Sequence, residues 1–484
     1  MRNNSEPTIF DLSSVGRNGY QLPESDVRGS EFPTEFARED LAFPELSEQD
    51  VVRHYSRLSA LNYHVDKGLY PLGSCTMKYN PKISEKTARL DGFTQLHPLQ
   101  PTETVQGALF LIYDLQHILS EISGFTACSL VPAAGAQGEF CGVKMIAAHH
   151  AYKKQHQRKV MLIPDSAHGT NPATSAMCGY ECMPVKTDSR GNIDLEDLAS
   201  KCNKELAGIM ITLPNTLGLF DENILKATAM VHKSGGLVYG DGANMNALLG
   251  IAWLSDLGFD VMHYNLHKTF STPHGGGGPG AGAVCCNRLL EPYLPGPICE
   301  MIEEGTKDEP PFYGLYSPER TIGMVKAFYG HFTVLVRAYT YLRVLGANGL
   351  RRVAEYAALN ANYLMQALKK TYPLPYDRTC IHEFVLDIKW EDAPDIRALD
   401  VAKRLMDFGY HPPTNYFPLI VHESLMIEPT ETENKRTLDE FIEAMNSIAE
   451  DARHAPEMLR KAPSETPFGR MDEVKAARDL KLTA

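Results

Sequence analysis

Short apolar runs alternate with longer amphipathic stretches through the middle of the chain, from about residue 107 to residue 287. The runs 158–164, 235–240 and 259–267 are rich in apolar residues and lead into polar ones, which is typical of buried strands. The stretch 140–154 instead repeats its apolar residues at helical spacing. Strands that alternate with helices in this way predict an α/β fold with a mostly parallel sheet.

The two ends of the chain have a different pattern. Residues 1–50 are polar and rich in turn formers, which indicates an arm, and the charged residues after about 456 indicate a surface helix or a tail. Between the ends we predict further elements: helices at 47–60, 323–345 and 437–449, strands at 383–388 and 424–427, a loop rich in Gly and Pro at 62–82, and a proline-rich connecting segment at 290–320.

These changes of pattern predict several regions, because 484 residues exceed what a single simple core holds. We predict an N-terminal arm and helical segment at 1–95, a large α/β domain at 96–330, a smaller C-terminal α+β domain at 331–455, and a tail at 456–484. The arm and the loop 70–82 carry too little apolar sequence to fold alone. We therefore expect both to be supported by another surface, such as a partner subunit.

Composition is that of an ordinary globular enzyme, with 43% apolar and 22% charged residues. The net charge of −13 disfavours nucleic acid and anionic membranes as main partners. None of the ten cysteines forms a Cys-x-x-Cys pair, so we predict no metal site and reduced thiols in a cytosol-like compartment. The N-terminus resembles neither a secretory signal nor a transit peptide, and no run approaches transmembrane length. We predict a cytoplasmic protein.

Two polar groups follow neighbouring predicted strands. Asp241 comes directly after the run 235–240, and Lys268 comes directly after the run 259–267. Ligands bind at the carboxyl ends of strands in such sheets. A carboxylate and an amine that meet there suit pyridoxal phosphate (PLP), because the lysine forms the Schiff base and the acid keeps the pyridine nitrogen protonated. The alternative is that Asp241 caps a helix and Lys268 is a solvated surface lysine.

A histidine and a helix entry add to this chemistry. His168 follows the run 158–164, where its flat imidazole could stack on a cofactor ring; a helix-capping or turn histidine is the alternative. The segment 132–139, Pro-Ala-Ala-Gly-Ala-Gln-Gly-Glu, opens the amphipathic stretch 140–154. Small residues at a helix start leave backbone N–H groups open to a phosphate, although an ordinary glycine-rich helix entry has the same appearance.

With these residues in place, the chain resembles a known family, glycine dehydrogenase (decarboxylating), which is the P protein of the glycine cleavage system. The resemblance is carried by motifs that span most of the chain in order: 70–82 (YPLGSCTMKYNPK), 132–139 (PAAGAQGE), 165–173 (DSAHGTNPA), 241–246 (DGANMN), 265–270 (NLHKTF), 274–280 (HGGGGPG) and 426–433 (MIEPTETE). Many P proteins are single chains of about twice this length, and this chain corresponds to their lysine-bearing C-terminal half, subunit 2.

The resemblance implies a fold type I, PLP-dependent transferase-like architecture and an enzyme that decarboxylates glycine. PLP would be linked covalently to Lys268, with Asp241 and His168 as the other catalytic residues. Further cofactor contacts would come from Ala136, Gln137, Asn244 and His267. CO₂ would be released, and the aminomethyl group would pass to the lipoyl arm of H protein. A separate subunit 1 is implied as the partner in an α₂β₂ heterotetramer, with the active site near the subunit boundary.

Two further segments have open interpretations. The loop 274–280 contains four consecutive glycines and could be a hinge that orders over substrate, or a tight crossing beneath the cofactor. Cys75, within Gly-Ser-Cys-Thr, lacks any sign of a base or of a thiolate-stabilising setting. We interpret its segment as a pocket wall or a partner-facing loop.

Two other functions remain open at this point. Another PLP enzyme of the same fold, such as an aminotransferase or a desulfurase, would share Asp241 and Lys268 but would not account for the motifs 70–82, 274–280 and 426–433. A non-catalytic scaffold subunit would have no need for Lys268. An aldimine absorbance that borohydride abolishes would exclude the scaffold, and glycine–bicarbonate exchange dependent on lipoylated H protein would separate the two enzymes.

Overall fold

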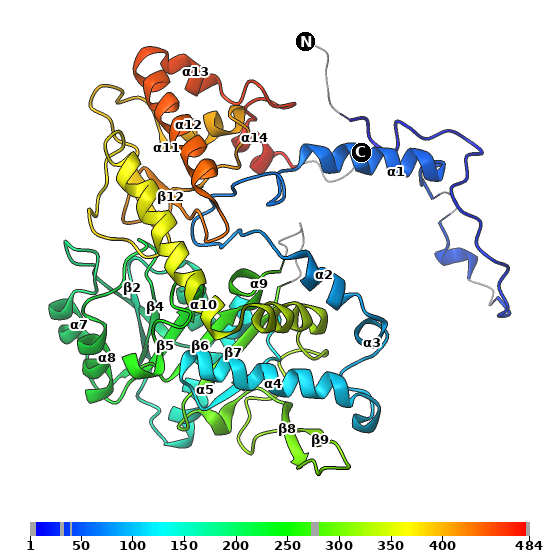
Figure 1. Cartoon of the computed structure of the whole chain (residues 1–484), viewed down its shortest axis with the longest axis vertical. Helices are drawn as coiled ribbons and strands as arrows, with labels where there is room; N and C mark the ends of the chain where they lie inside the picture. Colours follow the sequence, from blue (N-terminus) through cyan, green and yellow to red (C-terminus); the bar gives the residue numbers. More distant parts are fainter. Residues whose placement is uncertain (1–5, 30–32, 39–40, 273–279, 481–484) are drawn as a thin grey trace.

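The computed structural model describes residues 6–29, 33–38, 41–272 and 280–480. Its centre is a seven-stranded sheet with the order β1-β7-β6-β5-β4-β2-β3 (Figure 1). The strands are β1 (Ala127–Ser129), β2 (Val160–Pro164), β3 (Glu181–Val185), β4 (Leu206–Thr212), β5 (Leu237–Gly242), β6 (Val261–Asn265) and β7 (Gly282–Cys286). Strands β3, β2, β4, β5 and β6 pair in parallel, while β7 is antiparallel to β6 and β1. The predicted mostly parallel sheet is confirmed.

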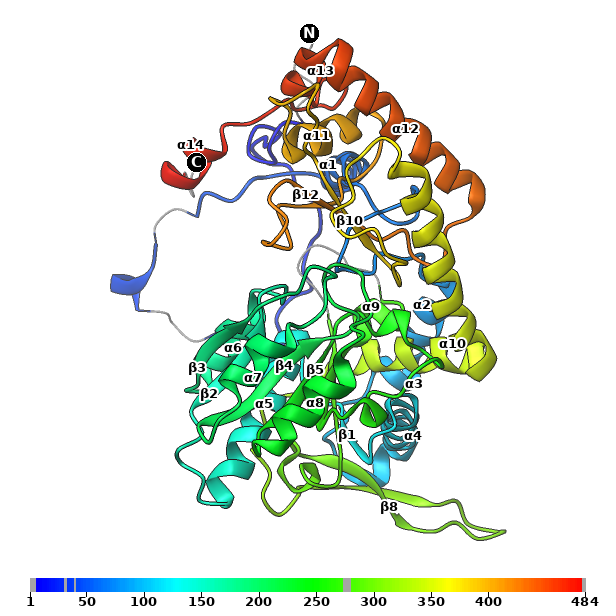
Figure 2. The same cartoon turned by 90° about the vertical axis from the view of Figure 1, so that its left-hand side faces the viewer.

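Helices cover both faces of this sheet, because successive side chains of a strand point to opposite sides. On β6, Val261 joins the apolar core beneath α5, while Met262 and Tyr264 join the core on the opposite face with α4 and α8. The helices of this domain are α4 (Gln106–Ser123), α5 (Gly135–Tyr152), α6 (Thr170–Met177), α7 (Leu195–Lys201) and α8 (Ile224–Lys233) (Figure 2). The amphipathic stretch predicted at 140–154 is the main part of α5.

A second, smaller sheet with its own apolar core lies beyond the long helix α10 (Phe332–Leu368). Its antiparallel strands have the order β10-β12-β11. The elements are β10 (Phe384–Asp387), β11 (Thr414–Asn415), β12 (Ser424–Ile427), α11 (Ala398–Asp407), α12 (Lys435–His454) and α13 (Pro456–Lys461). The strands predicted at 383–388 and 424–427 and the helix predicted at 437–449 are confirmed. The domain boundaries drawn at residues 95, 330 and 455 remain predictions.

Two predicted connections differ from the structure. The helix predicted at 323–345 begins at Phe332 and continues to Leu368, with a break at Gly346, whose φ of 60° takes it out of the helical conformation. The segment 290–320 was predicted as a plain connection, but it forms a projecting hairpin of β8 (Ile298–Glu303) and β9 (Phe312–Tyr316) (Figure 2). Its prolines hid the strand signal because they lie between and beside the strands.

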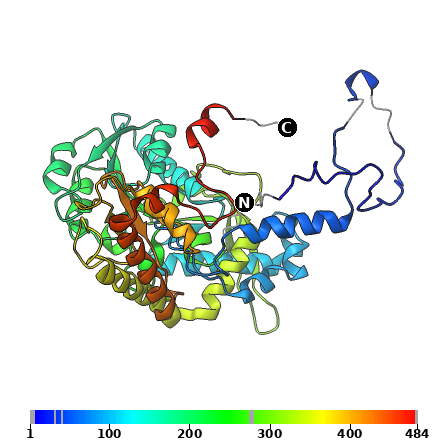
Figure 3. The same cartoon turned by 90° about the horizontal axis from the view of Figure 1, so that it is seen from above.

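The N-terminal arm extends away from the body of the protein (Figure 3). Helix α1 (Glu48–Leu61) confirms the prediction at 47–60 and begins at Ser47, whose hydroxyl accepts from the Asp50 N–H. Before α1 the arm leaves large apolar side chains exposed: Phe10, Val15, Tyr20, Leu22, Val27, Phe36, Leu41 and Phe43. In the described part of the chain, no helix combines the length and apolar character needed to cross a bilayer.

The remaining elements are short and connect those above. They are η1 (Thr34–Phe36), α2 (Lys82–Ala88), α3 (Asp91–Thr94), η2 (Thr102–Thr104), η3 (Met245–Ala247), η4 (Ser255–Leu257), α9 (Leu266–Thr269), η5 (Glu291–Tyr293) and α14 (Glu473–Arg478).

Candidate active site

The three predicted catalytic residues meet at the carboxyl edge of the large sheet. Asp241 lies near the end of β5, and Lys268 lies in α9, which directly follows the adjacent parallel strand β6. His168 lies between β2 and α6. Ser74 connects two of these residues, because its carbonyl accepts from Lys268 Nζ at 2.9 Å and its hydroxyl bonds His168 Nε2 at 2.6 Å.

Asp241 is a buried carboxylate that forms no ion pair or hydrogen bond with a lysine or arginine of the described residues. Only 1% of it is exposed. Oδ1 accepts from the Ala243 N–H at 2.9 Å and lies 3.6 Å from His263 Nε2. Burial alone would raise the pKa of Asp241, but His263, His168, the Ala243 N–H and Lys268 outweigh it, so the pKa is lowered. Asp241 is therefore an anion that can accept a positively charged partner.

Two neighbouring residues that the sequence reasoning did not single out complete this part of the site. Glu139 of α5 accepts from Thr170 Oγ1 at 2.9 Å and from Thr174 Oγ1 at 3.2 Å. Burial and the nearby Asp241 charge raise its pKa to about 8, so Glu139 is mainly protonated at neutral pH. With its amide nitrogen turned towards them, Asn171 donates to both Asp241 and Glu139 at 3.2 Å.

The imidazoles of the site are neutral at neutral pH. Burial lowers the pKa of His168 more than the Asp241 carboxylate raises it. The His168 ring stacks on Phe417, with centroids 5.2 Å apart and planes at 15°. Burial also lowers the pKa of His263 to about 4, and its Nδ1 bonds the Tyr239 hydroxyl.

The start of α5 offers a place for an anion. The first N–H groups of a helix have no partner inside it, and the helix dipole favours negative charge there. A glycine is required at 135, because a Cβ would lie 2.2 Å from Asn265 Oδ1. Ala136 is exposed in this turn. Gln137 is half-buried, and its side chain accepts from the Ala133 N–H at 2.7 Å and donates to the Val325 carbonyl at 3.0 Å. The side chain of Gln137 is thus held in place within the protein.

Asn244 and His267, the other two expected cofactor contacts, lie on either side of this edge. Asn244 donates through Nδ2 to the Pro214 carbonyl at 3.1 Å, and its buried Oδ1 has no hydrogen-bond partner among the described residues. His267 Nδ1 lies 3.2 Å from the backbone nitrogen and oxygen of Ala281. The glycine loop 274–280 lies, apart from Gly280, outside the described residues.

The segment 72–79, which we call the strap, connects the active site to the small domain. Leu72 forms an antiparallel bridge to Ile427, and the Gly73 N–H donates to the Met426 carbonyl at 3.2 Å. A Cβ at Gly73 would lie 2.2 Å from the Met426 side chain, so this crossing requires glycine. The motif 426–433 of the same chain thus supports the loop 70–82, and the expected contact of this loop with a partner subunit stays a prediction.

Lys78 anchors the far end of the strap through a buried ion pair. Its Nζ lies 2.9 Å from Glu431 Oε1 and also donates to Asn246 Oδ1 at 2.8 Å and to the Thr269 carbonyl at 2.6 Å. These contacts join the strap to the loop that follows β12 and to the end of α9. Burial raises the pKa of Cys75, within the strap, which is opposite to what an activated thiolate needs.

We expect Lys78→Ala to lower the free energy of unfolding by about 3–5 kcal/mol, because it leaves Glu431 buried without its cation. Chemical denaturation of the purified protein measures this change. Arg436→Ala, which removes an exposed ion pair to Glu440, is the control and should change stability little. An equal effect of the two substitutions would show that the buried pair does not anchor the strap.

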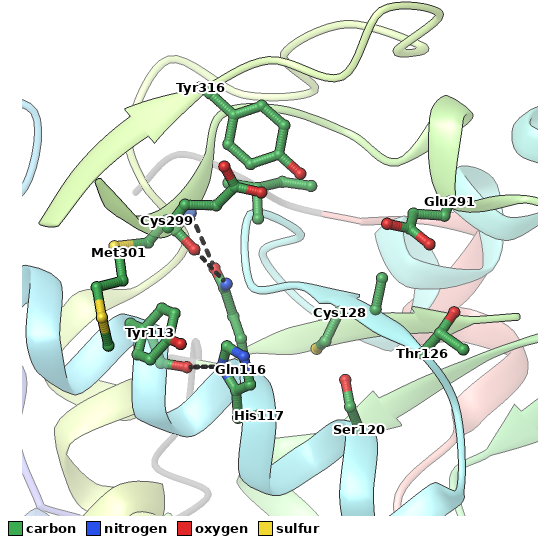
Figure 4. Close-up of a pocket in the computed structure, with 13 residues that line it drawn as sticks. Tyr113, Gln116, His117, Ser120, Thr126, Cys128, Glu291, Cys299, Met301 and Tyr316 are labelled. Atoms are coloured by element: carbon green, nitrogen blue, oxygen red, sulfur yellow. Dashed lines mark hydrogen bonds between the residues drawn. The ribbon is translucent and has the colours of Figure 1, made fainter. Parts of the chain in front are cut away.

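A separate cavity of about 410 Å³ lies beneath the β8–β9 hairpin (Figure 4). Gln116 and Cys299 exchange hydrogen bonds within it, and Tyr113, Cys128 and Glu291 line it (Figure 4). It contains none of the predicted site residues, so the catalytic chemistry is assigned to the edge that carries Lys268.

Comparison with known proteins identifies the family. A "Probable glycine dehydrogenase (decarboxylating) subunit 2" of Caldanaerobacter subterraneus subsp. tengcongensis is 54% identical over 476 residues, 97% of each chain. A protein of the same description from Chlorobium chlorochromatii is 53% identical over 99% of each chain. The chain belongs to the glycine dehydrogenase (decarboxylating) subunit 2 family. A family model for the glycine dehydrogenase C-terminal domain also matches residues 353–465.

Solved structures share the fold of this chain, an α/β domain with a mostly parallel sheet followed by a C-terminal domain. A crystal structure of glycine decarboxylase (P-protein) of the glycine cleavage system, in inhibitor-bound form, superposes with a TM-score of 0.72 over 86% of this chain and 93% of that chain, at 19% identity. Lactobacillus brevis glutamate decarboxylase gives a TM-score of 0.64 over 90% of this chain and 96% of that chain, at 13% identity. The expected fold class is confirmed.

Proposed function

We propose that this chain is the PLP-bearing subunit of a glycine decarboxylase, which releases CO₂ from glycine and passes the aminomethyl group to the lipoyl arm of H protein. Family membership supports the decarboxylation of glycine. The observation that carries the proposal for this chain is the convergence of Lys268, Asp241 and His168 at one sheet edge, with Ser74 bonded to both Lys268 and His168.

The residues present fit PLP. Asp241 is a buried anion that forms no ion pair or hydrogen bond with a lysine or arginine of the described residues, which suits a protonated pyridine nitrogen. The start of α5, with Gly135 against Asn265, suits a phosphate. Asn244 Oδ1 is a buried acceptor without a partner in the described chain, which suits a polar group of a ligand. Lys268 would hold the cofactor covalently.

PLP, when bound, would supply an electron sink for the pair of electrons left when CO₂ departs. Asp241 would keep a proton on its pyridine nitrogen by its negative charge. Asn171 and Ala243 orient the Asp241 carboxylate through their N–H groups. His168 is neutral and is held between Ser74 and Phe417. Its flat ring can therefore form one wall of the cofactor site without adding a charge.

Subunit 1 is the partner that we propose, because the curated relatives are described as subunit 2. The exposed apolar side chains of the arm, which include Phe10, Tyr20 and Phe43, are candidates for that contact, and the assembly would be α₂β₂. H protein would deliver its lipoyl arm to the edge that carries Lys268.

We expect the purified chain alone to be poorly active and to gain glycine–bicarbonate exchange when subunit 1 is added. The apolar side chains of the arm are exposed, and the arm extends away from the body (Figure 3), so the partner should slow hydrogen exchange of residues 6–43. Residues of α12 serve as the internal control, since their exchange should be the same in both states. Full activity of the isolated chain, or an arm that exchanges equally with and without subunit 1, would contradict this assembly.

A further inference from the structure

Two glutamates lie directly opposite each other at the ends of two paired strands of the small sheet. In the antiparallel pair β10–β12, Phe384 is the partner of Ile427. The next residues outward, Glu383 and Glu428, therefore face each other at the strand ends. Both are fully buried, as is the neighbouring His382. Polar atoms of the three side chains lie within 4.8 Å of one another.

Each glutamate uses one oxygen to hold the strap. Glu383 Oε2 accepts from the Ser74 N–H at 2.5 Å, and Glu428 Oε1 accepts from the Thr76 hydroxyl at 2.6 Å. Ser74 needs this restraint because its φ of 62° lies in the left-handed region, which a serine rarely adopts. The same Ser74 contacts both Lys268 and His168, so the two glutamates determine where these groups lie.

The second oxygen of each glutamate has no hydrogen-bond partner. Glu383 Oε1, Glu428 Oε2 and both ring nitrogens of His382 form no hydrogen bond to the described residues, although Glu383 Oε1 lies 3.6 Å from His382 Nε2. Among the described residues, no lysine or arginine forms an ion pair with either glutamate; Lys78 pairs with Glu431, and Lys268 donates to Ser74. Two buried carboxylates this close cannot both carry a charge without a large electrostatic penalty. One proton on either carboxyl group removes that penalty.

We propose that Glu383 and Glu428 share one proton and act as a clamp that positions Ser74 against Lys268 and His168. They are positioning residues, since they act through the strap. The consequence for catalysis rests on the proposed function, whereas the clamp itself does not.

The electrostatics of the site agree with a held proton. Burial, followed by the charge of Glu428, raises the pKa of Glu383 well above its usual range, and burial raises the pKa of Glu428 to about 8. Burial lowers the pKa of His382 to about 3, so this imidazole is neutral and supplies no countercharge. The titratable and charged groups that face the pair are His382, Cys75, Lys268, Lys78 and Glu431.

The shared proton makes the stability of the folded protein depend on pH. The folded protein holds it more tightly than the unfolded chain, in which a glutamate titrates near its ordinary value of 4.5. The stability that it contributes is therefore complete below pH 4.5 and is lost as the pH rises through about 8. Glu428→Gln keeps a neutral hydrogen-bonding group at every pH. We expect its unfolding midpoint to change less than that of the wild type between pH 6 and 9, by the part that the pair contributes.

Hydrogen exchange at the Ser74 amide tests the clamp directly. Glu383→Ala removes the acceptor, and we expect the Ser74 amide to exchange about tenfold to a hundredfold faster. Glu383→Gln keeps an acceptor oxygen and should restore protection to within about threefold of the wild type. A general loss of folding would accelerate exchange in α12 as well, so those amides show whether the effect is local.

Glu433→Gln is the matched control. Burial raises the pKa of Glu433 to about 7, so this variant should also change the pH profile of stability, but it should leave the Ser74 amide unchanged. The proposal is overturned if Glu428→Gln has the pH profile of the wild type, or if Glu383→Ala leaves Ser74 protected. It is also overturned if the purified protein carries one equivalent of a divalent cation that Glu428→Gln removes, because the pair would then hold a metal. Glycine exchange by the wild type tests the proposed function separately.

Discussion

Lys268→Ala should fold and bind PLP without a covalent link, and it should lose glycine decarboxylation almost entirely. The lysine lies just after β6, and its Nζ donates to the Ser74 carbonyl rather than to a carboxylate, so its removal breaks no direct ion pair among the described residues. Loss of a covalent catalyst reduces rates on the order of 10⁴-fold or more. Borohydride reduction followed by mass spectrometry of the peptide that contains residue 268 measures the link.

Lys326→Ala is the matched control for this prediction. Lys326 is the competing lysine, and its Nζ donates to the Gly330 carbonyl at 2.7 Å, away from the strand end. This variant should keep the covalent link. Fixation of the cofactor by borohydride in Lys268→Ala would show that another lysine holds it.

Asp241→Asn should still bind PLP but should decarboxylate glycine about 10²–10³-fold more slowly. The amide has no negative charge to keep the pyridine nitrogen protonated, so the electron sink is weakened at the step in which CO₂ leaves. The lowered pKa of Asp241 means that the wild-type carboxylate is ionised throughout the neutral range. Steady-state exchange rates at saturating glycine measure the loss.

Asp221→Asn separates this effect from damage to the fold. Asp221 is a buried aspartate that accepts from the Ile193 and Asn223 N–H groups, outside the proposed site. This control should lose stability while its rate per folded molecule stays near that of the wild type. Near-normal exchange in Asp241→Asn would exclude Asp241 as the partner of the pyridine nitrogen.

The sequence predicted the large sheet and the convergence of Asp241, Lys268 and His168 because each lies just beyond an apolar run. Parallel strands bring such positions to one edge whatever lies between them in sequence. The hydrogen bonds of Ser74 were not predictable in this way. Ser74 is separated from Lys268 by 194 residues and from Glu383 by 309 residues, and no local pattern specifies such long-range contacts.

The same reason explains why Glu139, Glu383 and Glu428 were not recognised as site residues. Glu139 and Glu428 lie inside motifs that carried the family resemblance, but a glutamate in a motif does not reveal that it is buried. Their raised pKa values arise from burial, which depends on packing between the strap and the two sheets. The one sequence signal available is an acidic residue directly beside an apolar strand, as Glu383 is before β10.

Glycine–bicarbonate exchange tests the central claim most directly. The chain is combined with subunit 1 and lipoylated H protein, and incorporation of labelled bicarbonate into the glycine carboxyl group is followed. We predict exchange that requires PLP, depends on lipoylated H protein and disappears with Lys268→Ala. An assembled, PLP-loaded complex that binds glycine but shows no exchange would contradict the assignment of this chain as a glycine decarboxylase subunit.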